Sequence, residues 1–202
     1  MYRKVIKRFL DIVLSFFAII VLAIPMAIVA IAIKIDTPGP VLFKQKRVGI
    51  GKSHFMILKF RSMPTTAPKD TPTHQLANAG SLLTPFEEKL RKSSLDELPQ
   101  LFNIFAGQMS FVGPRPALWN QYDLIEERDK YGANDVLPGL TGWAQINGRD
   151  ELPIDVKAAY DGEYAKKISF AFDLKCFFGT FSKVLKSEGV VEGARDAGEK
   201  NE

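Results

Sequence analysis

A long hydrophobic run near the start of the chain is the clearest feature of its residue pattern. Residues 12–33 carry no charge, and these about 22 residues match the length that a helix needs to cross the hydrocarbon core of a bilayer. The run is longer than the apolar part of a usual signal peptide, and no small-residue cleavage site precedes the polar part of the chain. We therefore expect a helical membrane anchor over residues 1–36.

The charge pattern around this anchor favours a hairpin that enters and leaves by one face of the membrane. Basic residues lie on both sides of the run, so both ends prefer the cytoplasmic side. Pro25 lies near the middle, where it leaves the Val21 carbonyl without its helical partner, and we expect a bend there. The halves, 12–24 and 26–33, are each too short to span alone. A kinked crossing stays open, because spanning helices tolerate proline when neighbouring groups satisfy the freed carbonyl.

A short β element is predicted directly after the anchor. The turn-rich stretch 36–40 ends the membrane helix, and residues 41–60 mix apolar and basic residues in short, strand-like pieces. Residues 65–84 are rich in Pro, Thr, Asn, Asp and Gly and have little periodicity. We expect this second stretch to form a surface loop.

The remaining pattern is mainly helical. Helical spacing occurs in residues 85–92, from Ser94 onward, and in residues 119–131. Residues 152–187 predict amphipathic helices that either rest on lipid or present an ordinary core face. We predict an α+β fold, mainly helical, with a membrane anchor (1–36) that either re-enters or spans, a compact domain (37–187) and a frayed polar tail (188–202).

Charge and cysteine content limit the partners and the chemistry expected of this domain. The 202 residues carry a net charge of +4, and the basic residues gather on both flanks of the apolar run, which favours an anionic membrane surface. This placement, with no recognised binding module, argues against a nucleic-acid partner. The single cysteine, Cys176, permits no intramolecular disulfide and is expected to be buried and inert. His54 and His74 lack ligand spacing, so we predict no metal role for them.

Two adjacent acids provide the strongest candidate for chemistry. Asp96 and Glu97 stand in the segment Ser94-Leu-Asp-Glu-Leu-Pro-Gln100, at the start of a predicted helix. A structural explanation is available, because Ser94 and Glu97 have the spacing of a capping box and Asp96 would favour the positive end of the helix. The pair becomes a reactive centre only if basic residues and a ligand converge on it.

Several basic residues are candidates for that convergence. Arg115 is held between two prolines in Gly113-Pro-Arg-Pro116, which makes a stiff platform for a bidentate phosphate contact. Arg91 precedes the acid pair, and Lys59 and Arg61 lie in the stretch 59–63, whose successive side chains alternate in direction if it is a strand. Each could equally be a solvated charge. The glycine-rich segment 138–149 is either a connecting loop or a backbone cradle for an anionic ligand.

Taken together, six motifs resemble the bacterial sugar transferase family, and more narrowly its small monotopic phosphoglycosyl transferases. They follow the family's order from Tyr2 to about Lys186. The motifs are Lys7-Arg-Phe-Leu-Asp11, Lys59-Phe-Arg-Ser-Met63, Ser94 to Gln100, Asn103, Met109-Ser-Phe-Val-Gly-Pro-Arg-Pro116 and Pro138 to Arg149.

The resemblance implies a transfer of sugar phosphate from a UDP-sugar to a polyprenol phosphate such as undecaprenyl phosphate, with release of UMP. It implies that Asp96 attacks the sugar-bearing phosphate and forms a covalent intermediate, while Glu97 assists and helps to hold Mg²⁺. Physical reasoning agrees, because a carboxylate attacks a diphosphate only when cations reduce the repulsion. Oxygen ligands and a phosphate substrate favour Mg²⁺ over zinc.

By matching position, Arg115 should bind phosphate, with positive charge added by Lys59, Arg91 and Arg149. Arg61 and Asp161 are further candidates for the donor site. The same resemblance implies a re-entrant anchor in the bacterial inner membrane, with the catalytic domain on the cytoplasmic face and in contact with membrane lipids. Two alternatives stay open from the residues alone, a membrane-bound nucleotide-sugar hydrolase and a non-catalytic membrane adaptor. The oligomeric state is open as well, with a homodimer among the options.

Overall fold

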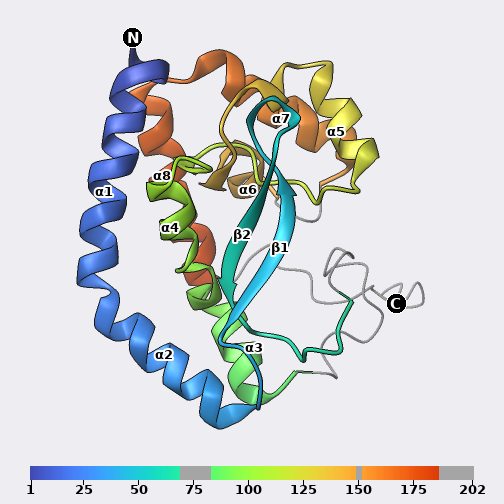
Figure 1. Ribbon diagram of the computed structural model, residues 1–202. Coiled ribbons are helices and arrows are strands. Elements are labelled where there is room, and N and C mark those ends of the chain that lie inside the picture. Colours follow the sequence, from blue (N-terminus) through green and yellow to red (C-terminus); the bar gives the residue numbers. More distant parts are fainter. Residues whose placement is uncertain (69–82, 149–151, 187–202) are drawn as a thin grey trace.

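The computed structural model describes residues 1–68, 83–148 and 152–186, with the side chains of 1–68, 83–148 and 152–180 (Figure 1). Helices dominate these residues, and two small sheets of two strands each accompany them. The prediction of a mainly helical α+β fold is confirmed. The predicted tail 188–202 and most of the predicted loop 65–84 lie outside the described residues.

The N-terminal arm bends at Leu22, three residues before the proline that was expected to mark the break. Its pieces are a π-helical turn Tyr2–Ile6, α1 Lys7–Val21 and α2 Ala23–Asp36. Leu22 leaves the helical conformation (φ −91°, ψ 4°), and the two helices meet at a bend of 60°. Pro25 is thereby in the first turn of α2, where a backbone N–H has no helical partner to lose. The proline causes the break. Because it is accommodated in the first turn of α2, the bend lies before it, at Leu22.

By length and composition, no single helix in the described ranges could cross a membrane, whereas the bent pair α1 and α2 passes that test together. Figure 1 shows this pair as an arm along one side of the molecule. Many of its apolar side chains are exposed, among them Val21, Ile24 and Ile35 at 73, 75 and 80%. The arm therefore presents an apolar surface that the other described residues leave exposed.

Polar contacts fix the first turns of α1 to the body. The Lys7 ammonium lies 2.7 Å from the buried Asp173 carboxylate of α8 (Phe170–Lys186). Arg8 donates to the last two carbonyls of α4 (Gln100–Phe105). Asp11 accepts from the Ser110 hydroxyl at 3.0 Å. The charged motif before the apolar run is thus used to attach the arm, and the direction of α1 is set by three separate elements.

The body contains an antiparallel hairpin and a parallel strand pair. In the hairpin, β1 Leu42–Val48 pairs with β2 His54–Phe60, and a 3₁₀ turn joins them at Ile50–Lys52, which confirms the strands expected in 41–60. The second pair, β3 Ser110–Val112 and β4 Gly139–Thr141, was not predicted. The parallel pairing joins the segments around Gly113 and Gly139 so closely that a Cβ on Gly139 would lie 2.1 Å from the Gly113 nitrogen.

The helix α3 covers Pro85–Lys92 as predicted, and it is the helix that carries a capping box. Thr84 accepts from the Glu87 N–H, and the Glu87 carboxylate accepts from the Thr84 N–H. The capping box considered at Ser94 and Glu97 is wrong, because Ser94 adopts a left-handed conformation (φ 56°) and its side chain caps nothing. A 3₁₀ turn, Leu95–Glu97, follows Ser94, and α4 begins only at Gln100.

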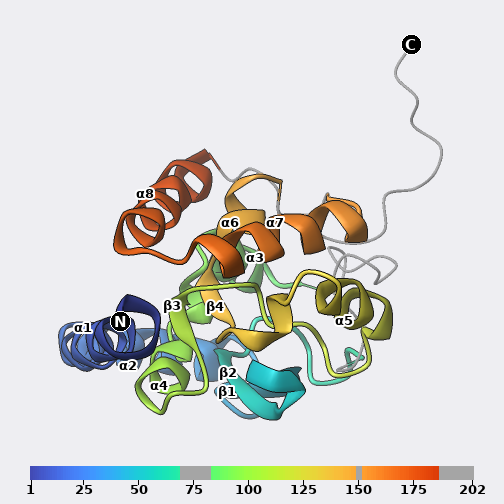
Figure 2. The ribbon, with the colours of Figure 1, turned by 90° about the horizontal axis from the view of Figure 1, so that it is seen from above.

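The second half of the chain covers the sheets with short helices. They are α5 Tyr122–Asp129, a 3₁₀ turn Ala133–Asp135, α6 Trp143–Ile146, α7 Ile154–Lys167 and α8 Phe170–Lys186. Helix α5 is shorter than the predicted 119–131, because the backbone turns between Leu118 and Gln121 before it begins. In the view from above, α4 and α8 flank the arm formed by α1 and α2 (Figure 2).

The main apolar core lies between the hairpin and α4. Phe55 and Ile57 of β2 pack with Leu101 and Ile104 of α4, and the end of α1 contacts the same cluster. Ile104 is fully buried. One apolar cluster joins the arm, the hairpin and α4. These three elements therefore hold their relative positions around the turn that carries the two acids. Cys176 is buried in a separate cluster with Tyr164, as expected for an inert thiol.

Candidate active site

The two acids lie on the 3₁₀ turn between α3 and α4. Both are buried, with Asp96 at 6% and Glu97 at 9% exposure, whereas the neighbouring Leu95 is 41% exposed. The Ser94 carbonyl accepts from the Glu97 N–H at 3.1 Å, which closes the turn. Local backbone geometry therefore directs both carboxylates into the protein, although charged side chains are rarely buried unless they are paired.

Two cations converge on Glu97. The Lys59 ammonium lies 2.8 Å and the Arg115 guanidinium 3.2 Å from the same oxygen, Oε1. Lys59 comes from the inner face of β2, and Arg115 follows β3. The structure thus brings together three of the predicted site residues that are separated by up to 56 positions in sequence. Because the buried Glu97 carboxylate pairs with two cations, the role of this acid goes beyond that of a helix cap.

Asp96 has a different environment from that of Glu97. The Ser62 hydroxyl lies 3.5 Å from its Oδ2 atom. Burial raises the pKa of the Asp96 carboxyl above its ordinary value, and the neighbouring Glu97 raises it further, while Lys59, Arg91 and Arg115 act in the opposite direction. Arg91 of α3 therefore contributes positive charge on this side. The positive charge around Asp96 favours its ionised form, which is the form that can act as a nucleophile.

Asn103 fixes the position of Lys59 relative to the acids. The Asn103 amide accepts from the Leu58 N–H and donates to the Met56 carbonyl, both at 2.9 Å. With these two hydrogen bonds, the Asn103 side chain takes the place of a neighbouring parallel strand at the edge of β2 opposite β1. Burial lowers the pKa of Lys59, and the acid pair opposes this effect. Because Asn103 belongs to α4, the helix that follows the acids, it ties the lysine strand to the acidic turn.

Arg61 and Asp161 make contacts away from the acid pair. Arg61 donates to the main-chain carbonyls of Ile33, Thr37 and Pro38, so it caps the end of α2. Asp161 is 1% exposed and forms an ion pair with Arg128. The candidate Arg149 lies outside the described residues. For these three residues a role in donor binding stays a prediction, and the first two have a structural partner instead.

The acid pair also suits the ligand preferences of magnesium. No group of three or more His, Cys, Asp or Glu side chains suited to a metal occurs among the described residues. Mg²⁺ does not require such a group, because one or two carboxylates with substrate phosphates and water commonly complete its shell. Asp96 and Glu97 supply oxygen ligands from adjacent positions of one turn. The residues present therefore fit a magnesium ion that is shared with a phosphate substrate.

Two residues that hold the site were not found by sequence reasoning. Asn103 was noted only as part of a motif, and Arg128 was treated as part of a helix. A buried asparagine or arginine has no local signature, since its position in the sequence resembles that of any surface residue. Their signal lies in burial, at 2% and 4% exposure, which appears only once the elements are packed.

Comparisons with known proteins identify the family of this chain. The model of the family described as "Bacterial sugar transferase" matches residues 2–187. The "UDP-glucose:undecaprenyl-phosphate glucose-1-phosphate transferase" of Xanthomonas campestris pv. campestris is 37% identical over 191 residues, which cover 91% of this chain and 40% of that protein. The "Uncharacterized sugar transferase EpsL" of Bacillus subtilis is 37% identical over 186 residues, or 92% and 90% of the two chains.

A third relative names a different sugar. The "UDP-N-acetylgalactosamine-undecaprenyl-phosphate N-acetylgalactosaminephosphotransferase" of Aeromonas hydrophila is 35% identical over 193 residues, covering 91% of this chain and 44% of that protein. The chain thus spans less than half the length of the Xanthomonas and Aeromonas relatives but nearly all of EpsL. With a family match over residues 2–187, a buried acid pair and two cations bound to it, the chain belongs to the bacterial sugar transferase family.

Proposed function

We propose that the chain is a phosphoglycosyl transferase that moves a sugar phosphate from a UDP-sugar to a polyprenol phosphate and releases UMP. The observation that carries the proposal is the buried pair Asp96 and Glu97, with Lys59 and Arg115 bound to Glu97 and their charges acting on Asp96 as well. Family membership and the names of the relatives support the same reaction class.

Asp96 is the nucleophile in this proposal. One carboxylate oxygen bonds to the phosphorus that carries the sugar, and the bond from that phosphorus to the UMP oxygen breaks, so that UMP leaves with the electron pair. A phosphate oxygen of the polyprenol phosphate then attacks the same phosphorus and releases the Asp96 carboxylate. The product is a polyprenol diphosphate sugar. Neither step requires an oxidant or a reductant, and the enzyme returns to its starting state.

Cations lower the repulsion between the attacking carboxylate and the donor diphosphate. Arg115 provides a planar guanidinium suited to two phosphate oxygens, and Lys59 provides a compact charge between the acids. Arg91 adds positive charge near Asp96, and Arg149 would add more by its position in the motif 138–149. Mg²⁺ would be held by Asp96 and Glu97, and when bound it would neutralise phosphate charge. A donor phosphate that displaces Glu97 from Arg115 would free this guanidinium at the moment when the substrate arrives.

The apolar surface supports a membrane location, and the basic residues on both flanks of the apolar run favour the cytoplasmic face of the bacterial plasma membrane. Exposed large apolar residues occur on the arm, on α4 and on α8. They include Phe9, Leu14, Phe17, Ile20, Val21, Ile24, Ile28, Ile31 and Ile35 of the arm, Phe102 and Phe105 of α4, and Phe170, Leu174, Phe177 and Phe178 of α8. We propose that the bent pair enters and leaves one leaflet while α4 and α8 rest at its surface.

The nucleophile can be tested by intact-protein mass spectrometry. Wild-type protein in nanodiscs, incubated with a UDP-sugar and Mg²⁺ but without acceptor, should gain the mass of one sugar phosphate on Asp96. Asp96→Asn should form no adduct and release no UMP, whereas the exposed Asp129→Asn should behave as wild type. An adduct on another side chain, or turnover by Asp96→Asn, would contradict the proposal.

The acceptor requirement separates the remaining candidate functions. The proposed transferase releases UMP over many turnovers only when polyprenol phosphate is present, and chelation of Mg²⁺ by EDTA should stop it. A nucleotide-sugar hydrolase would turn over donor without lipid. A membrane adaptor would bind lipid vesicles and release no UMP in any condition. A panel of UDP-sugars in the same release assay identifies the donor.

A further inference from the structure

The segment that carries Arg115 is held by its carbonyl groups. Prolines on both sides of Arg115 have no N–H to donate, so regular backbone pairing is not available to them. Three consecutive carbonyls are instead bound by three elements: Pro114 accepts from the Gly139 N–H of β4 at 2.8 Å, and Pro116 from the Arg47 guanidinium of β1 at 2.9 Å. The carbonyl of Arg115 itself accepts from Arg128 of α5, at 3.0 Å.

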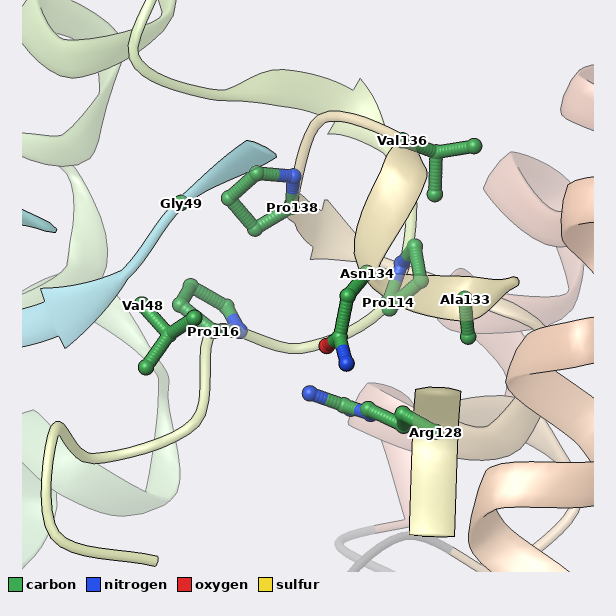
Figure 3. A pocket seen from close by; sticks show the side chains of 9 residues that line it. All are labelled: Val48, Gly49, Pro114, Pro116, Arg128, Ala133, Asn134, Val136 and Pro138. Atoms are coloured by element: carbon green, nitrogen blue, oxygen red, sulfur yellow. The ribbon is translucent and has the colours of Figure 1, made fainter. Parts of the chain in front are cut away.

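Arg128 is in turn fixed by a buried ion pair. Its Nε and Nη2 atoms lie 2.8 and 2.6 Å from Oδ2 of Asp161, in α7, and Nη2 is the atom that also reaches the Arg115 carbonyl. The exposures are 4% for Arg128 and 1% for Asp161. Figure 3 shows the Arg128 side chain extending toward the loop that carries Pro114 and Pro116. The three residues thus form a continuous chain of contacts from α7 to Arg115.

This arrangement is unfavourable for stability alone. A buried ion pair repays its loss of hydration only partly, and apolar residues of similar size often replace such a pair without loss of stability. A planar guanidinium is nevertheless well suited to this position, because N–H groups along one edge can donate to a carboxylate while another N–H donates to a carbonyl. The contact with the Arg115 carbonyl is therefore a specific reason for an arginine here.

We infer that Arg128, oriented by Asp161, is a positioning residue that fixes the Arg115 main chain so that the Arg115 guanidinium meets the donor phosphate. The inference rests on the proposed function, in which Arg115 binds that phosphate. Arg128 touches no substrate in this arrangement. Its effect passes through Arg115, whose guanidinium already lies 3.2 Å from Glu97. Small displacements of a phosphate-binding group reduce catalysis strongly, by up to about 100-fold for 1 Å.

A paired apolar replacement separates positioning from stability. Arg128→Met combined with Asp161→Leu removes both buried charges at once, so the variant should unfold at about the wild-type temperature. It leaves the Arg115 carbonyl without its donor. We expect the rate of sugar-phosphate adduct formation to fall about 10- to 100-fold. Leu124→Ala is the matched control, because it weakens the same helix α5 in its buried core contact and leaves Arg128 in place.

A double-mutant cycle tests whether the effect passes through Arg115. Arg115→Ala should itself slow adduct formation, and adding the Arg128 and Asp161 replacements to Arg115→Ala should cause no further loss. Arg128→Lys, which keeps a charge opposite Asp161 but lacks the planar fork, should show an intermediate rate and provides a second folded variant.

Three outcomes would overturn the inference. One is a wild-type rate in the paired replacement, which would mean that the ion pair serves stability alone. Another is an equal fold-loss with and without the Arg115 side chain, which would place the effect elsewhere. The third is a wild-type rate in Arg115→Ala, which would remove the role of Arg115 as well. Adduct formation on Asp96 in that last case would leave the proposed transfer reaction intact.

Discussion

Removing the Lys59 ammonium should affect both the stability and the pH dependence of this protein. The side chains of Lys59 and Glu97 are 15% and 11% exposed, and their charged atoms are 2.8 Å apart. At an effective dielectric constant of about 20, charges at this distance attract each other by roughly 6 kcal/mol before the cost of dehydration. Lys59→Met leaves Glu97 with Arg115 on the same oxygen, so part of the compensation remains.

We therefore expect Lys59→Met to lower the free energy of unfolding by about 3 kcal/mol, the lower end of the range for breaking a buried ion pair. Adding Glu97→Gln should recover part of this loss, because the double variant no longer buries a carboxylate that has lost one of its two cations. Lys52→Met is the matched control, since Lys52 forms an exposed pair at the hairpin tip. It should unfold close to the wild-type denaturant concentration.

The pH dependence follows from the effect of Lys59 on the nucleophile. Among the charges around Asp96, Lys59 contributes most to lowering the pKa of that carboxyl, against a larger rise from burial. Only the ionised carboxylate can attack, so activity falls as the pH drops through this pKa. Without Lys59 the pKa is higher still, and the acidic limb of the turnover profile should move to higher pH. Lys59→Arg keeps the charge and should leave this limb close to its wild-type position.

The assay is the rate of UMP release between about pH 4 and 8, with unfolding by denaturant measured on the same nanodisc samples. Two results would refute the reasoning. An acidic limb that stays in place or moves to lower pH in Lys59→Met would show that Lys59 does not stabilise the ionised nucleophile. Equal destabilisation in the single and double variants would show that Lys59 and Glu97 are not energetically coupled.

Three further variants test how the site is held. Asn103→Ala leaves a buried N–H and a carbonyl of β2 unpaired, so unfolding should be easier by about 2–4 kcal/mol in denaturant titrations. Gly139→Ala places a Cβ 2.1 Å from the Gly113 nitrogen and should cost at least about 3 kcal/mol, whereas Gly51→Ala, with nothing within 4 Å, should cost about 1 kcal/mol from its positive φ alone. Arg61→Ala removes the cap of α2 and should raise amide hydrogen exchange in the last turn of that helix about tenfold or more; unchanged exchange would contradict the cap.

Local pattern was sufficient for the hairpin strands and for α3, but it predicted neither of the short strands β3 and β4. The hairpin strands and α3 follow from residue alternation and from turn residues at their ends, which act within a few positions. The uncharged run predicted a helical arm with a break at Pro25, and the break occurs at Leu22. The reason is that a proline is acceptable in the first turn of a helix, so the helix before it ends earlier than the proline itself.

The sequence by itself determined which groups are available for chemistry: an adjacent acid pair, an arginine between prolines, and a charged motif before an apolar arm. Tertiary structure alone decided how they are used. The contacts of Lys59 with Glu97 and of Arg128 with Asp161 join residues 38 and 33 positions apart, and no local rule selects such partners. The physical reason is that the energy and the role of a buried charge depend on the atoms packed around it, and packing brings together elements that are distant in the sequence.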